Sequence, residues 1–231
     1  DYTALATTRR LPSNRRSVMS EPTEEVRGRE VVIRFTASRC IHARHCVLGR
    51  PDVFVPNVPG EWIHPDRATA AEVAEIAHAC PSGAITYARV DGGPAEQPPR
   101  VNTVRIRENG PLAFHAPLVV NGAPAGFRAT LCRCGASRRK PFCDGAHAAA
   151  GFAATGEPAT GALPALAERG GTVSVTTVPD GPLRVTGALE VVSGTGRSTG
   201  RGTEFYLCRC GASRQKPFCD GSHKAAGFRA P

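Results

Sequence analysis

LCRCGASRRKPFCDGAHAAAGF, residues 131–152, returns almost unchanged as LCRCGASRQKPFCDGSHKAAGF at residues 207–228. The copies are offset by 76 residues, and of 22 aligned positions only 139/215, 146/222 and 148/224 differ. Upstream, ENGPLAFHAPLVVNG (108–122) resembles PDGPLRVTGALEVVSG (179–194). Short runs of Val, Thr and Ile separated by Gly-Pro turns are typical of strands. Each copy is therefore predicted to be a small β-meander that leads into a Cys/His loop and a helical turn.

Each loop carries three cysteines and one histidine with the spacing C-x-C-x8-C-x3-H. Residues i and i+2 of an extended segment face the same side, so the C-x-C pair can hold one metal ion together. The last Cys and the His are four residues apart, which stacks side chains on one helix face. Asp144 is predicted to cap that helix, and Ser137 and Ser213 to donate hydrogen bonds to the loop. The candidate ligands are Cys132, Cys134, Cys143 and His147 in the first copy and Cys208, Cys210, Cys219 and His223 in the second.

This donor set fits two kinds of centre. A Cys3His zinc knuckle would be tetrahedral and purely structural. Zinc ligand pairs usually sit two to four residues apart, and C-x-C is tighter than that. The spacing therefore favours an iron–sulfur centre over zinc by a small margin and leaves both open.

The two loops together resemble the CDGSH (mitoNEET-like) iron–sulfur family. Its pattern, C-x-C-x2-(S/T)-x3-P-x-C-D-G-(S/A/T)-H, is satisfied at every position by both copies, with Ala146 where the family name has Ser. The resemblance implies a 2Fe-2S cluster in each copy, with one iron on the C-x-C pair and the other on the remaining Cys and His. It also implies that the tandem copies form, within one chain, the two-fold unit that single-motif members form as dimers. The chain is accordingly expected to be a monomer.

The other three cysteines, Cys40, Cys46 and Cys80, lie in residues 30–90. Bacterial ferredoxins combine a C-x2-C-x2-C run with a remote Cys-Pro. Here Cys40 and Cys46 occupy the outer positions of the run, Ala43 the middle one, and Cys80 precedes a proline.

The sequence around these cysteines predicts an α+β unit. EVVIRF before Cys40 and AITY after Cys80 are typical of a strand pair. PDRATAAEVAEIAHAC (65–80) has apolar residues at helical spacing, which predicts a helix that delivers Cys80.

RCIHARHCVLGRPDVF…EWI…CPSGAIT resembles single-cluster ferredoxins, especially three-iron types and divergent forms fused to CDGSH modules. With three thiolates and Ala43 in the vacant place, the resemblance implies a 3Fe-4S cluster. A 4Fe-4S cluster whose fourth ligand is His42, His45 or water is the alternative. The fold class expected for the whole chain is α+β, a ferredoxin-like domain followed by a β-rich tandem CDGSH domain with internal pseudo-two-fold symmetry.

The amino-acid composition argues against a disulfide scaffold and a membrane-spanning protein. Nine cysteines cannot all pair, so a pure disulfide scaffold is disfavoured. A hydrophobic content of 41% allows a packed core. No apolar run approaches the roughly 18 residues that a membrane-spanning helix needs. Thiols in a reducing cytoplasm serve metals rather than disulfides, and a cytoplasmic location is expected.

Pro/Gly-rich stretches and the repeat divide the chain into six segments. The first is a leader, either disordered or added to the natural chain ahead of Met19; an Arg-rich organelle transit segment is the other interpretation. The predicted segments are leader 1–29, first domain 30–90, linker 91–100, first repeat 101–153, linker 154–171 and second repeat 172–231.

Three functions are compatible with these features. Iron–sulfur centres cycle by one electron and no catalytic motif is visible, so the leading hypothesis is an electron-transfer protein that is not an enzyme. It would work with a reductase and an acceptor enzyme, without nucleic acid or membrane. The alternative is a cluster donor or redox/pH sensor, because the His ligand of each repeat can be protonated. A net charge of +9 leaves a zinc-containing nucleic-acid binder as a third, weaker hypothesis.

Overall fold

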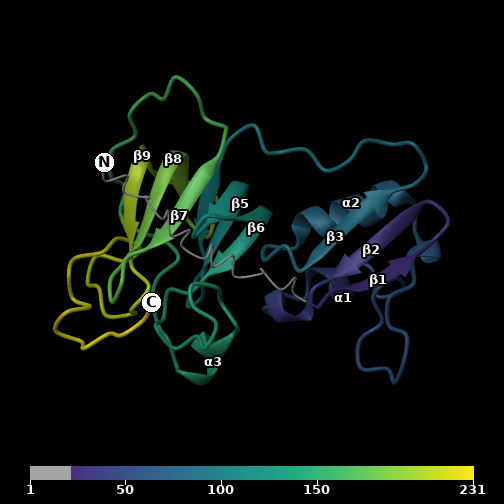
Figure 1. Ribbon diagram of the computed structural model, residues 1–231, viewed down its shortest axis with the longest axis horizontal. Coiled ribbons are helices and arrows are strands. Elements are labelled where there is room, and N and C mark those ends of the chain that lie inside the picture. The colour runs from purple at the N-terminus through teal and green to yellow at the C-terminus, as the bar shows by residue number, and fades with distance from the viewer. Residues whose placement is uncertain (1–21) are drawn as a thin grey trace, which may run out of the picture.

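Two lobes lie side by side in the computed structural model, which describes residues 22–231 (Figure 1). Of the leader predicted for residues 1–29, residues 1–21 lie outside the described residues. A small α+β domain contains the first three cysteines, and a larger, β-rich domain contains both repeats. The predicted α+β class therefore agrees with the structure. None of the helices within residues 22–231 has the length and apolar character needed to span a bilayer.

The small domain is a three-stranded antiparallel sheet, in the order β1 (Glu24–Arg27), β2 (Val31–Phe35) and β3 (Ile85–Arg89). The predicted pair is β2 and β3, with Ile33 opposite Tyr87. Strand β1 was not predicted. Its position shows that the first domain begins before residue 30, the boundary predicted between leader and domain. Val26 of β1 pairs with Ile33 and packs on the core of the domain, so residues 24–29 belong to the domain and not to the leader.

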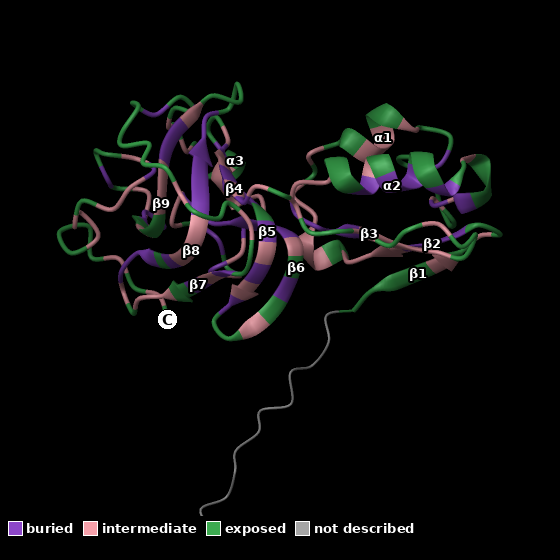
Figure 2. Cartoon of the chain, turned by 90° about the horizontal axis from the view of Figure 1, so that it is seen from above, coloured by how far each residue is buried: buried purple, intermediate pink, exposed green. Residues whose placement is uncertain are grey.

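Two helices, α1 (His45–Gly49) and α2 (Ala70–Ala79), cover one face of this sheet (Figure 2). The helix predicted over 65–80 is shorter than expected. Short 3₁₀ turns occupy Ala37–Arg39 and Pro65–Arg67, and α2 begins only after Thr69. Thr69 forms a capping box with Glu72, in which each side chain bonds the other's backbone N–H, and this fixes the start of the helix. Cys80 follows the last turn in extended conformation.

The large domain is a six-stranded sheet that closes on itself. Strand β4 (Thr103–Ile106) pairs with β5 (Leu112–Val120), β5 with β7 (Val173–Thr177), β7 with β8 (Leu183–Val192), and β8 again with β4. Strands β6 (Ala123–Leu131) and β9 (Ser198–Leu207) extend the circuit from β5 and β8. Both lead into the Cys/His loops, the first of which contains the short helix α3 (Ala146–Ala149).

The repeats exchange strands in a reciprocal way. The first strand of each lies antiparallel to its own second strand and parallel to the second strand of the other repeat, so that Val104 faces Val191 and Val175 faces Val120. One core of buried side chains from both repeats fills the circuit. The predicted meanders therefore exist but are not independent units, because each completes its sheet with a strand of the other.

The segment 154–171, predicted to be a linker, is bonded along the large domain. Gly161 N donates to Thr199 O at 2.7 Å, and Asn102 N donates to Arg169 O at 2.7 Å. Asn102 is completely buried, and its side-chain amide also donates to Gly171 O and Ala188 O at 2.9 Å each. This segment thus fixes the start of the second repeat against the first.

We expect Leu189→Ala to lower the free energy of unfolding by about 2–5 kcal/mol, because Leu189 is fully buried in the shared core. Leu163→Ala, at a side chain that is 42% exposed, is the control and should change it by less than about 0.5 kcal/mol. Denaturant unfolding followed by circular dichroism measures both. Equal shifts would contradict the shared core.

Candidate metal centres

The Cys/His loop of each repeat is closed at its base by two backbone hydrogen bonds. After β6 the chain leaves the sheet at Cys132 and returns to the end of β6 at Cys143. Cys132 N donates to Pro141 O at 2.8 Å, and Cys143 N donates to Thr130 O at 2.9 Å. The equivalent bonds of Cys208 and Cys219 in the second repeat are both 2.8 Å long. The ends of β6 and β9 therefore place the first and third cysteine of each loop next to one another.

The four predicted ligands of each repeat form two contacting pairs. In the first repeat, the Sγ atoms of Cys132 and Cys134 are 3.7 Å apart, and Cys143 Sγ lies 3.4 Å from His147 Nδ1. In the second repeat the corresponding distances are 3.6 and 3.4 Å. Two ligands at about 2.3 Å on one tetrahedral ion would be about 3.8 Å apart. Each pair is thus spaced to share one metal ion.

The arrangement as a whole fits two irons better than one zinc. A zinc knuckle needs four donors around one point. A 2Fe-2S cluster needs two donors at each of two irons, which is the division into pairs that the loops show.

The predicted helical turn exists in the first loop as α3, but it begins later than expected, and side-chain hydrogen bonds shape the rest of the loop. Ser137 Oγ donates to Phe142 O at 2.7 Å, as predicted for a serine that closes the turn. Asp144, however, is not the helix cap: α3 begins after Gly145, so Cys143 and Asp144 lie outside the helix. Instead, the Asp144 carboxylate accepts from Arg138 N at 2.9 Å and Ala146 N at 3.1 Å, and so ties both arms of the loop together.

The two C-x-C segments meet each other directly. Cys134 and Cys210 pair as an isolated antiparallel bridge between the repeats. Gly135 and Gly211 follow them with φ of +82° and +83°. A Cβ at Gly135 would lie 2.4 Å from Cys210 O, and one at Gly211 would lie 2.5 Å from Cys134 O. Only glycine allows this backbone approach.

A buried arginine stands between the cysteines of each C-x-C pair. Arg133 and Arg209 are each 1% exposed. Their Nε atoms donate to Gly110 O at 2.9 Å and to Gly181 O at 2.8 Å. Burial lowers the pKa of both guanidinium groups, while the charge of a thiolate in the other repeat, Cys208 for Arg133 and Cys132 for Arg209, acts in the opposite direction. Each buried positive charge therefore favours an anionic centre in the opposite loop.

Burial and hydrogen bonding change the pKa values of the candidate ligand thiols. Burial raises the pKa of Cys143 to about 11. A hydrogen bond from Cys134 lowers the pKa of Cys132 to about 6, and the same contact raises the pKa of Cys134. The Cys132 thiol therefore loses its proton readily, whereas the Cys134 thiol keeps its proton. Backbone N–H groups of Ala136 and Gly145 donate to Cys134 Sγ and Cys143 Sγ at 3.4 Å. A bound metal would compensate the buried thiolates.

The small domain brings its three cysteines to one cavity of about 300 Å³. Cys40 follows a 3₁₀ turn, Cys46 lies in α1 and Cys80 follows α2. Burial raises the pKa of Cys40 and Cys46. The predicted vacant position and the alternative ligands also line this cavity, with His42 and His45 exposed at its rim and Ala43 between them. The residues present thus fit a cluster held by three thiolates.

Some residues at these centres were not predicted from the sequence. Trp62 packs on Phe35 at 4.8 Å between ring centroids and also lines the cavity. Ser82 Oγ lies 3.6 Å from Cys80 Sγ. The importance of Arg133 and Arg209 could have been inferred from the sequence, because both C-x-C pairs have arginine at the central position.

Comparison with known proteins agrees with this geometry. Residues 89–148 and 180–224 match the iron-binding zinc finger family of CDGSH type. These two segments are CDGSH-type iron-binding domains. Residues 26–90 match a second family, the divergent 4Fe-4S mono-cluster domain, and this match begins within β1. The three matched segments contain every predicted ligand, and the chain is an iron–sulfur protein.

Two curated relatives are similar to part of this chain. Both carry the name uncharacterized protein YjdI, one from Escherichia coli strain K12 and one from Escherichia coli O157:H7. Each is 34% identical over 61 residues, which is 26% of this chain and 78% of YjdI.

We expect Gly135→Ala to loosen both centres of the CDGSH repeats, because its Cβ would overlap Cys210 O across the repeat contact. Gly145→Ala is the matched control: it has nearly the same φ, +83°, but a Cβ there meets nothing within 4 Å. Both variants carry the cost of a left-handed alanine, about 1–2 kcal/mol. Visible absorbance during heating should fall at a clearly lower temperature for Gly135→Ala alone. Identical curves would show that the contact does not support the centres.

Proposed function

We propose that the protein is an electron-transfer protein and not an enzyme, with a 2Fe-2S cluster in each repeat and one 3Fe-4S or 4Fe-4S cluster in the first domain. Such clusters supply one-electron exchange when bound. The observation that carries the proposal is the direct contact of the two C-x-C segments at Cys134 and Cys210. This contact brings the ligand sets of two proposed redox sites together inside one domain. A purely structural metal site, or a protein with a single binding site, would not require such a contact.

The residues that would hold each cluster follow from the ligand pairs. Cys132 and Cys134 would hold one iron and Cys143 and His147 the other, with the second repeat arranged likewise. In the first domain, three thiolates fit a three-iron cluster. The family description and the two histidines at the cavity rim support the four-iron form.

Iron and sulfide analysis of anaerobically purified protein tests these assignments. We expect about seven iron and eight sulfide ions per chain with a three-iron cluster, or about eight of each with a four-iron cluster. A paramagnetic signal from the oxidised protein would identify the three-iron form, because oxidised 2Fe-2S clusters are diamagnetic. Stoichiometric zinc with little sulfide would contradict the proposal.

We expect His147→Cys and His223→Cys each to lower the reduction potential of one centre by roughly 100–300 mV, because a neutral imidazole is replaced by an anionic thiolate. Redox titration followed by absorbance and electron paramagnetic resonance measures the shift. His64→Cys, remote from the three ligand sets in the sequence, is the control. An unchanged potential in both ligand variants would remove the two histidines from the ligand sets.

Electron transfer itself requires that the protein return unchanged from a redox cycle. All centres should be reduced and reoxidised in one-electron steps while the iron and sulfide content stays constant. Reduction to the point of cluster loss would instead favour the second candidate, a cluster donor or redox/pH sensor. That candidate is supported by the half-exposed positions of His147 and His223, the one imidazole among the proposed ligands of each repeat.

The proposed partners are a reductase and an acceptor protein, and the proposed functional unit is one chain. The contact between the two repeats, which a single-motif protein would need a second copy to make, is internal here. The net charge of +9 would steer an acidic partner toward the surface.

A further inference from the structure

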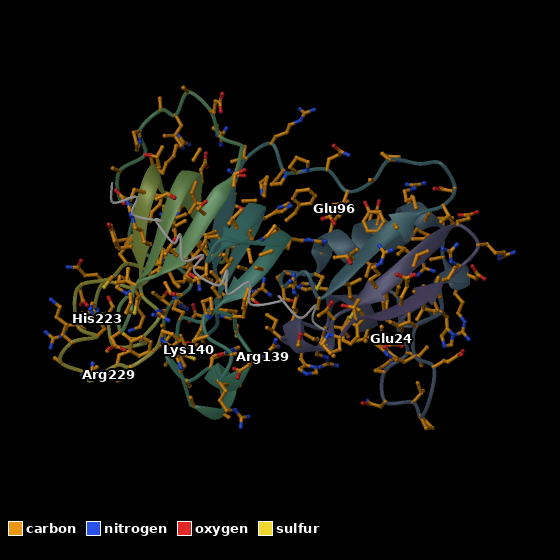
Figure 3. All side chains as sticks on the ribbon, in the orientation of Figure 1. Glu24, Glu96, Arg139, Lys140, His223 and Arg229 are labelled. Carbon is orange, nitrogen blue, oxygen red and sulfur yellow. The ribbon has the colours of Figure 1, made fainter. Side chains whose placement is uncertain are left out.

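One of the three differences between the two loops lies where the small domain touches the repeats. Position 139 is arginine in the first repeat, and the equivalent position 215 is glutamine. Arg139 Nη1 donates to the carbonyl oxygen of Ser38, in the turn that precedes Cys40. Arg139 is half-buried there, whereas Gln215 is exposed. Figure 3 shows Arg139 below β6, on the side that faces the small domain.

Two more contacts join the same surfaces. Arg39 Nη1 donates to Ala125 O in β6 at 3.2 Å. Near Cys80, a Cβ at Gly83 would lie only 2.5 Å from Arg128 O, also in β6. β6 is the strand of the large domain nearest the small domain in both views (Figures 1 and 2). All three contacts use residues within three positions of Cys40 or Cys80.

The linker reinforces this docking. Glu96, which follows the small domain in the chain, forms an ion pair with Arg128 at 2.9 Å (Figure 3). The Arg128 and Glu96 side chains are only 4% and 13% exposed, so the pair is shielded from solvent. Breaking a shielded pair leaves one charge buried without its partner, which costs more than breaking a surface pair does. The small domain is thus fixed on the first repeat at the edges of its own thiol cavity.

The second repeat presents its loop to solvent instead. Cys219 is partly exposed, whereas its counterpart Cys143 is buried, and Asp220 is exposed, whereas Asp144 is partly buried. The two Cys/His loops, although nearly identical in sequence, therefore differ in their surroundings: the first faces the small domain and the second faces solvent.

We propose that Arg139 is a positioning residue that docks the thiol cavity of the small domain on the first repeat alone and leaves the second repeat as the outward site for the acceptor protein. The order of contact is then small domain, first repeat, second repeat. The docking stands on the contacts above, and its consequence for electron exchange rests on the proposed function.

Arg139→Gln tests the inference in the full holo-protein. The variant gives the first loop the residue that the second loop already carries, so the loop is expected to fold and to keep its iron and sulfide. Arg138→Gln is the matched control, because it removes the same charge one residue earlier from an exposed side chain. Small-angle scattering and limited proteolysis at the 91–100 linker measure docking. Rapid-mixing absorbance measures electron equilibration between the small-domain centre and the repeats.

We expect Arg139→Gln to increase cleavage at the linker and the radius of gyration, and to slow equilibration several-fold, whereas Arg138→Gln matches the wild type. If Arg139→Gln and Arg138→Gln behave alike in both measurements, the positioning role is wrong. If wild-type centres exchange no electrons but Arg139→Gln still loosens the linker, the docking stands and the proposed function fails.

A second pair of variants avoids the repeat loop altogether. Gly83→Ala would push against Arg128 O, whereas Gly92→Ala, also at positive φ, meets nothing within 4 Å. Gly83→Ala should reproduce the looser docking and slower equilibration, and Gly92→Ala should not. Unaltered docking in Gly83→Ala would mean that the two surfaces are not in contact in solution.

Discussion

The close approach of two backbone segments at Cys134 and Cys210 is the constraint on which the large domain depends. It requires glycine at the next position in both copies, since any Cβ would overlap the opposite carbonyl oxygen. It also brings together two sets of thiolates, whose mutual repulsion must be offset. The buried guanidinium groups of Arg133 and Arg209, each attracted to a cysteine of the other repeat, provide part of that compensation.

The strand exchange explains why this contact is stable. Each repeat is too small to enclose its own apolar side chains, and each contributes its first strand to the sheet of the other. The loops are then held on the ends of β6 and β9, which extend from one closed circuit. Rigid strands, rather than flexible connections, set the separation between the two ligand sets.

The pairing of the candidate ligands could be predicted from the sequence because their spacing is local. C-x-C places two thiols on one side of an extended segment, and the structure has them 3.7 Å apart. The helix expected for the second ligand pair was only partly right, because Asp144 bonds across the loop instead of capping, a preference that depends on the folded loop. Strand β1 was missed because EEVR lacks the β-branched alternation of β2 and is held in place by its neighbour. Strand exchange and the docking of Arg139 are contacts between residues far apart in the chain, which no local pattern encodes.

Joining both repeats in one polypeptide has a consequence for their evolution. In a homodimer, a substitution in one loop appears in the other as well, so both faces of the assembly must remain identical. Here the loops are encoded separately, and positions 139/215 and 148/224 already hold different side chains. Duplication and fusion thus free one copy to specialise for an internal neighbour while the other meets the outside.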